Sequence, residues 1–204
     1  ATDLVPLGAA NDPGPPAPNA VVAMAQQADG TVWLGTASTL YQVSRERELV
    51  RKLRHGAGNT NFIHADAKGV LWVGTQDGLY QLPAGAAGLL RVAQTDGRPW
   101  GGDIYAAANT GDGGLWVGGV NGLFHIAPGA SQAQPVATEA GHGLGNPIVV
   151  GMLKDRQGRL WLDTAVAGLH RMLRWDGRVA AFDRVSTRLG AVGRPFGASL
   201  LEDS

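Results

Sequence analysis

Gly69-Val70-Leu71-Trp72-Val73-Gly74-Thr75-Gln76-Asp77-Gly78-Leu79-Tyr80 is the stretch that decides the fold, because it describes a whole β-hairpin. Residues 71–75 and 79–81 are short apolar runs that form the predicted strands. The Asp77-Gly78 pair between them favours a tight turn with positive φ. Side chains alternate along a strand, so Leu71 and Trp72 face opposite sides of the sheet. A sheet that is apolar on both sides must lie between two others.

Three more stretches repeat this plan, each with Gly three residues before a Trp, at Trp33, Trp116 and Trp161. Successive Trp residues are separated by roughly 40–45 residues, a period typical of propeller blades. Helical solenoids would need long apolar patterns with a 3.6-residue period, which this chain lacks. The sequence therefore predicts an all-β fold, a β-propeller of four-stranded antiparallel blades.

The whole chain, 1–204, is predicted to be part of one propeller. The predicted blades cover 20–54, 59–94, 103–139 and 148–186, residues 196–204 begin a fifth blade, and 4–7 form an orphan outer strand. The two ends do not supply all the strands of one blade. We therefore expect that the chain does not close into a ring by itself and that it self-associates through exposed blade faces.

The innermost strands are predicted from a column of small residues that would face a narrow central channel. This column contains Ala23, Ala106 and Gly151, with Phe62 as the exception that fills part of the channel. The outer strands are predicted at 49–53, 89–93, 134–138 and 179–185.

A four-residue turn that ends in Gly precedes each hairpin, and these turns begin at Gln27, Asp66, Thr110 and Asp155. A side-chain oxygen at the first position can cap the turn, and Gly at the fourth supplies the left-handed conformation. The recurring aspartates, Asp66, Asp112 and Asp155, are therefore interpreted as capping residues rather than as metal ligands or acid–base groups.

Composition excludes several classes of protein. Among 204 residues, Lys+Arg and Asp+Glu both number 17, so no net charge attracts the chain to nucleic acid. Cys is absent, which removes disulfides, thiolate catalysis and Cys-ligated zinc. No apolar run in the chain is long enough to cross a bilayer. Nothing in the sequence indicates a cofactor.

The pattern Asp-x-x-Gly-x-Leu-Trp-x-Gly-Thr followed by Gly-Leu resembles the two-component regulator propeller repeat. Residues 66–80 fit it best, and 155–169 fit it with Asp163 where Gly is usual. The family occurs in periplasmic sensor regions of hybrid histidine kinases and diguanylate cyclases. The resemblance implies a periplasmic or extracytoplasmic sensor module in signal transduction, with no catalytic residue carried over.

Loops that join successive blades are the predicted ligand-binding parts, since propellers bind ligands where such loops meet at the channel mouth. Trp100 beside Asp103 would stack a small molecule such as a carbohydrate and bond its hydroxyls. The alternative is that Trp100 covers an edge of the core. The candidate site residues are Asn59, His64, Trp100, Asp103, His142 and Asn146.

An enzyme is the second hypothesis, specifically a propeller enzyme resembling the streptogramin-inactivating lyases. It requires a His and a carboxylate that converge at the channel mouth, with His64 and His142 as the candidate histidines. The motifs of serine hydrolases, P-loop proteins and helical zinc proteases are absent. We accordingly predict no catalytic residue and no metal site.

Overall fold

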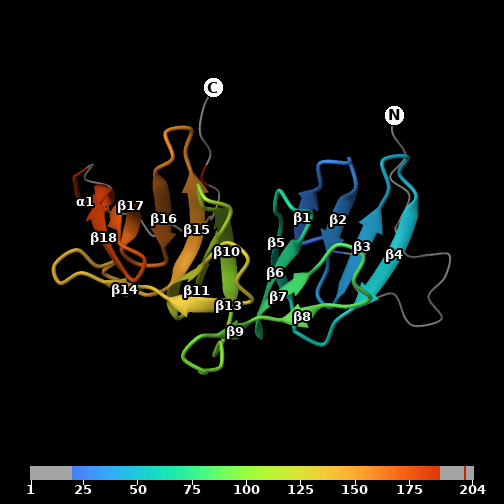
Figure 1. Cartoon of the computed structure of the whole chain (residues 1–204), viewed down its shortest axis with the longest axis horizontal. Helices are drawn as coiled ribbons and strands as arrows, with labels where there is room; N and C mark the ends of the chain where they lie inside the picture. Colours follow the sequence, from blue (N-terminus) through green and yellow to red (C-terminus); the bar gives the residue numbers. More distant parts are fainter. Residues whose placement is uncertain (1–19, 189–199, 201–204) are drawn as a thin grey trace.

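The structure, a computed structural model, describes residues 20–188 and 200. Four antiparallel sheets follow one another along the chain, and the one helix in the described part is α1, Val185–Arg188. Figure 1 shows the sheets arranged in an arc, with the first sheet (blue) at one end and the fourth (orange to red) at the other. The predicted fold class, antiparallel blades of a β-propeller, is confirmed. The strands predicted at 4–7 and in 196–204 lie outside the described residues, apart from Leu200.

Each sheet contains four consecutive strands. The first has β1 (Ala23–Gln26), β2 (Val32–Gly35), β3 (Thr39–Val43) and β4 (Leu49–Arg54). The second has β5 (Thr60–Ala65), β6 (Leu71–Thr75), β7 (Gly78–Leu82) and β8 (Leu90–Arg91). The third has β10 (Ile104–Asn109), β11 (Leu115–Gly119), β12 (Gly122–Ile126) and β13 (Gln132–Pro135). The fourth has β15 (Val149–Lys154), β16 (Leu160–Thr164), β17 (Gly168–Trp175) and β18 (Val179–Arg184).

Two short strands pass from one repeat into the next sheet, which the sequence did not predict. β9 (Ala93–Gln94) follows β8 but pairs in parallel with β13 of the third sheet. β14 (Ala137–Thr138) follows β13 but pairs in parallel with β18 of the fourth sheet. The predicted outer strands at 89–93 and 134–138 are therefore each divided between two sheets, because the connecting chain satisfies its backbone groups on the next edge.

The core lies between successive sheets. One apolar cluster fills each of the three interfaces, and each contains a hairpin Trp: Trp33, Trp72 or Trp116. These side chains are buried, and burying one of them contributes roughly 1.5–3 kcal/mol. The inner strands contact one another in chain order, β1 with β5, β5 with β10 and β10 with β15. In the described part of the chain, the first and fourth sheets share no comparable contact.

The turn of the hairpin at 71–82 lies one residue earlier than predicted. Gln76 and Asp77 form the turn, and Gly78, at φ 126°, already pairs with Thr75 in the sheet. The Thr75 hydroxyl donates to the Gly78 carbonyl at 2.9 Å and accepts the Asp77 N–H at 3.2 Å. Thr75 thus closes the turn with its own side chain.

A glycine column lets neighbouring sheets approach closely. A Cβ on Gly118 would lie 2.6 Å from the Val149 side chain, and one on Gly74 would lie 2.7 Å from the Ile104 carbonyl oxygen. The Phe62 ring also lies against Gly74 and packs on the cluster between the second and third sheets. Phe62, which was predicted to fill part of a central channel, thus has its ring in the space that the missing Gly74 side chain leaves.

Candidate functional site

Most repeats tie the hairpin Trp to the turn that precedes it. The indole N–H donates to the side chain six residues earlier, at 3.0 Å from Trp33 to Gln27 Oε1, 3.1 Å from Trp72 to Asp66 Oδ2 and 2.8 Å from Trp161 to Asp155 Oδ2. Gly at the fourth turn position has positive φ in all four repeats. The bond leaves the indole N–H of these repeats unavailable to a ligand.

Asp155 shows how strongly the turn holds a carboxylate. Its Oδ1 accepts the backbone N–H groups of Gln157 at 3.0 Å and Arg159 at 2.8 Å. Burial opposes ionisation of Asp155, but hydrogen bonds from Trp161 and Arg159 outweigh it and lower the pKa to about 2. The capping interpretation of Asp155 accounts for its contacts.

The third repeat departs from this arrangement. Thr110 occupies the first turn position, and its hydroxyl donates to Asp112 rather than reaching the Trp. The indole N–H of Trp116 therefore has no hydrogen-bond acceptor among the described residues. Within residues 20–188, only His55 Nδ1 and His170 Nε2 are both sealed from solvent and unpartnered. Trp116 is 6% exposed, and its nitrogen is not among these sealed atoms.

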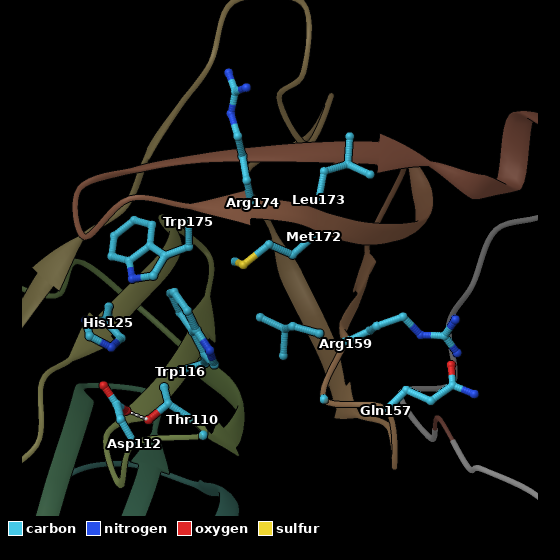
Figure 2. Close-up of a pocket in the computed structure, with 13 residues that line it drawn as sticks. Thr110, Asp112, Trp116, His125, Gln157, Arg159, Met172, Leu173, Arg174 and Trp175 are labelled. Atoms are coloured by element: carbon cyan, nitrogen blue, oxygen red, sulfur yellow. Dashed lines mark hydrogen bonds between the residues drawn. The ribbon is translucent and has the colours of Figure 1, made fainter.

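Trp116 lies at a cleft of about 390 Å³ between the third and fourth sheets. Figure 2 shows Trp116, His125 and Trp175 gathered at one side of this cleft, with Thr110 and Asp112 beside them. The ring centroids are 4.7 Å apart for Trp116–His125, 5.1 Å for Trp116–Trp175 and 5.4 Å for His125–Trp175. The three rings form a contiguous aromatic wall, contributed by β11, β12 and β17.

The charges around the cleft are distributed unevenly. Arg159 and Arg174 point away from the aromatic wall in Figure 2 and pair with Asp155 (2.5 Å) and Glu139 respectively. Burial lowers the pKa of His125, although Asp112 opposes the shift, so the neutral form of the ring is favoured. Hydrogen bonds from Thr110 and Gly114 lower the pKa of Asp112. Asp112 is therefore an ionised carboxylate beside uncharged rings.

The two equivalent clefts lack this combination. The cleft between the second and third sheets is smaller, about 170 Å³, and the N–H of Trp72 at its wall is bonded to Asp66. The cleft between the first and second sheets is about 360 Å³, but the N–H of Trp33 is bonded to Gln27. Of these three clefts between described sheets, the one at Trp116 has both the largest volume and an indole N–H that is not bonded to the preceding turn.

Trp100, the predicted stacking residue, lies in the core. It is 2% exposed, its ring centroid is 4.8 Å from that of Phe124, and its N–H donates to the Val92 carbonyl at 2.6 Å. It packs directly over Gly78, where a Cβ would lie 2.6 Å from the ring. In this structure Trp100 covers a core edge, as the alternative interpretation proposed, and its faces are not open to a sugar.

The remaining loop candidates have local partners. Asp103 accepts a hydrogen bond from Asn61 Nδ2 at 2.9 Å, and the Asn146 side chain accepts the Ile148 N–H at 3.0 Å. Asn59 is exposed. Burial, together with Asp103, raises the pKa of Tyr105. These contacts stabilise the starts of inner strands.

The two histidines of the enzyme hypothesis have different surroundings. His64 Nε2 lies 2.9 Å from the amide oxygen of Asn109, which is not a carboxylate, and His142 is exposed. No hydrogen bond joins any two of the six candidate residues in the described structure. Within residues 20–188 and 200, no three His, Asp or Glu side chains are placed to hold one metal ion.

The cleft residues were not predicted, because propellers commonly bind ligands at the loops between blades and this cleft lies between two sheets. A signal was present at Thr110, the one turn that begins with a side chain too short to reach the Trp six residues later. Trp175, the second Trp outside the hairpin column, was a further signal, because an extra aromatic residue at a strand end must pack against a neighbour.

The fold defines the class of protein as a propeller, and solved structures agree with that class. The extracellular domain of BT4673 from B. thetaiotaomicron, described in one structure as a hybrid two-component system and in another as a one-component system, matches with TM-scores of 0.60 and 0.59 and 15% identity. The extracellular domain of BT3049 from the same organism, described as a hybrid two-component system, matches at 0.56 and 19%. PorZ, a surface component of the type-IX secretion system of Porphyromonas gingivalis, matches at 0.56 and 17%.

Each match covers 74% of this chain and 21–25% of the other, so the chain spans about a quarter of these proteins. The expected resemblance to two-component regulator propellers is confirmed at the level of the fold, which is all that these identities establish. No family model and no curated protein matches the sequence. None of the helices in the described residues has the length and apolarity needed to span a membrane.

Proposed function

We propose that the chain is a ligand-binding module in the extracytoplasmic part of a bacterial signalling receptor. The similarity to extracellular domains of two-component systems supports the setting. The observation that carries the binding role is the cleft of about 390 Å³ at Trp116. The Trp116 N–H and the ionised Asp112 carboxylate both line this cleft, and no hydrogen bond joins them. A stable core residue would have its N–H satisfied, as Trp33, Trp72 and Trp161 do.

The cleft is suited to a sensor because its walls come from two different sheets. Trp116 and His125 belong to the third sheet, and Trp175 belongs to the fourth. A ligand that contacts both walls favours one packing of the two sheets over others, and such differential affinity shifts a conformational equilibrium. The module thereby converts small-molecule binding into a change of sheet packing.

Thermal denaturation of the 204-residue chain in the presence of a small-molecule library tests this role. We expect one chemical class to raise Tm in a concentration-dependent way, since a ligand that binds only the folded state stabilises it. Mass spectrometry of the compound after incubation with the chain shows whether the compound has been chemically converted. No stabilisation by any class would contradict the binding role, and conversion of the compound would favour an enzyme.

A further inference from the structure

We infer that the cleft between the third and fourth sheets binds a neutral, polyhydroxylated ring of the carbohydrate class, and that Thr110 is the residue that opens this site. The inference rests on the proposed binding function and specifies its location and ligand chemistry. It moves the binding site from the loops between blades to the face where the Asp-x-x-Gly turns lie.

The first step is the availability of donors. Trp116 and Trp175 each carry an indole N–H with no acceptor among the described residues, and both line the cleft. In the repeats at Asp66 and Asp155, a carboxylate six residues before the Trp takes this donor. The Thr110 hydroxyl is engaged with Asp112 instead. Two indole donors therefore require acceptor oxygens from a ligand or solvent.

The second step is the acceptor on the same wall. Asp112 accepts the Thr110 hydroxyl and the Gly114 N–H at 3.3 Å through Oδ1, which leaves Oδ2 to accept from a ligand. A hydroxyl group donates and accepts at once, so several hydroxyls on one ring satisfy both the indole donors and the carboxylate. Trp116 and His125 are only 6% and 9% exposed, so the half-buried Trp175 supplies the open apolar surface for the C–H face of such a ring.

Charge decides against other small molecules. An anion would meet the Asp112 carboxylate, while the two nearby arginines are turned outward and paired with Asp155 and Glu139. A simple ammonium ion would suit Asp112 and the rings but would offer no acceptor to the indole donors. A neutral hydroxylated ring can bond both to the two indole donors and to Asp112, and it can enter a cleft of about 390 Å³.

Thr110→Asp is the decisive variant, because it restores at the third repeat the acceptor that Asp66 and Asp155 provide. It should give the Trp116 N–H an acceptor, although it also replaces the Thr110–Asp112 hydrogen bond by two neighbouring carboxylates. An unchanged fold, checked by Tm and the backbone NMR spectrum, shows that loss of binding does not come from misfolding. Gln27→Asp makes the matching change in the first repeat, away from the cleft. Asp112→Asn removes the ligand-facing charge and is expected to weaken binding.

The experiment follows the indole N–H signals of the ¹⁵N-labelled chain by NMR. The probes are a panel of neutral mono- and disaccharides, with tetramethylammonium chloride and sodium glucuronate as charged comparisons. We expect a neutral saccharide to shift the Trp116 and Trp175 signals, and Thr110→Asp to weaken this binding about tenfold or more. Gln27→Asp should bind as the unaltered chain does.

Each other outcome overturns the inference in a distinct way. Saccharide binding that survives Thr110→Asp would place the ligand elsewhere and leave the proposed binding function intact. A shift of the Trp116 signal by a charged probe alone would reject the ligand class. Absence of any shift with every neutral saccharide would reject the inference, while the library screen would still decide the proposed function.

Discussion

A single side chain in each turn determines whether the indole N–H of the hairpin Trp is hydrogen-bonded within the chain. Asp66 is the fullest example, because Oδ1 accepts the Lys68 and Val70 N–H groups at 2.9 Å and Oδ2 accepts the Trp72 N–H at 3.1 Å. One carboxylate thus joins the turn backbone to the core. The same position occupied by Thr110 leaves the Trp free, so a one-residue difference separates a structural repeat from a candidate binding repeat.

Asp66→Ala removes all three of these hydrogen bonds and leaves the Trp72 N–H unpaired. We expect the free energy of unfolding to fall by about 2–3 kcal/mol. Denaturant titration measures this change. Asp29→Ala is the matched control, since Asp29 accepts the single N–H of Thr31 in the equivalent turn and should matter much less. Equal effects of the two substitutions would contradict the role given to the Trp bond.

His170 is expected to make stability depend on pH. Its side chain is fully buried, Nδ1 lies 2.8 Å from the Gly168 carbonyl oxygen, and Nε2 has no partner among the described residues. Burial lowers its pKa from the ordinary 6.5, although the Gly168 bond opposes this shift. The stabilisation is therefore fully present above pH 6.5 and is lost as pH falls toward the folded-state pKa, because the unfolded chain takes up the proton first.

Denaturation between pH 5 and pH 8 measures that dependence. His170→Leu should flatten the loss of stability below pH 6.5, since the group that binds the proton on unfolding is gone. His55 and His125, whose pKa values are also lowered by burial, account for a remaining slope. An unchanged slope in the variant would show that His170 is not responsible.

At the scale of strands, close approach between sheets depends on the glycine column. Gly74→Ala would push a methyl group against the Phe62 ring and the Ile104 carbonyl, and we expect destabilisation of about 1–3 kcal/mol. Gly88→Ala is the control, because nothing lies within 4 Å of a Cβ there. Thermal unfolding of both variants tests the difference. Tolerance of Ala at position 74 would mean that the sheets have room to separate.

The strands also show what sequence can predict. The hairpins of Trp33, Trp72, Trp116 and Trp161 were predictable because each is local, with apolar runs and turn residues in one short stretch. β9 and β14 were not, because their pairing with β13 and β18 depends on where a neighbouring sheet edge lies in space. The cleft at Trp116 was missed for the same reason, since Trp175 reaches it from another sheet.

At the scale of the whole molecule, none of the other described sheets covers the outer face of the first sheet. Met24, 70% exposed, and Val50, 60% exposed, lie on this face, while Ala23 and Leu53 pack toward the second sheet. Apolar residues on an open sheet face favour association. We therefore propose that copies of the chain associate through this face.

Light scattering across a range of protein concentrations tests this association. The apparent mass should rise with concentration, and Met24→Asp should lower it by placing a charge in the contact. Ala67→Asp adds the same charge on an exposed turn and should have no effect. A monomer at every concentration, or equal effects of both substitutions, would contradict the proposal.

β14 has a mechanical consequence for the cleft. It continues directly from β13 of the third sheet and pairs with β18 of the fourth through Ala137↔Val179 and Thr138↔Ala180. The polypeptide between β13 and β14, together with the backbone hydrogen bonds between β14 and β18, thus links the two walls of the cleft at their outer edge. This link fixes the separation of the two outer edges, so we expect any relative movement of the walls to be a rotation about it. We accordingly expect a ligand bound at Trp116 to tilt one sheet against the other. Because the inner strands β10 and β15 contact each other, this tilt would also change their packing near the propeller axis.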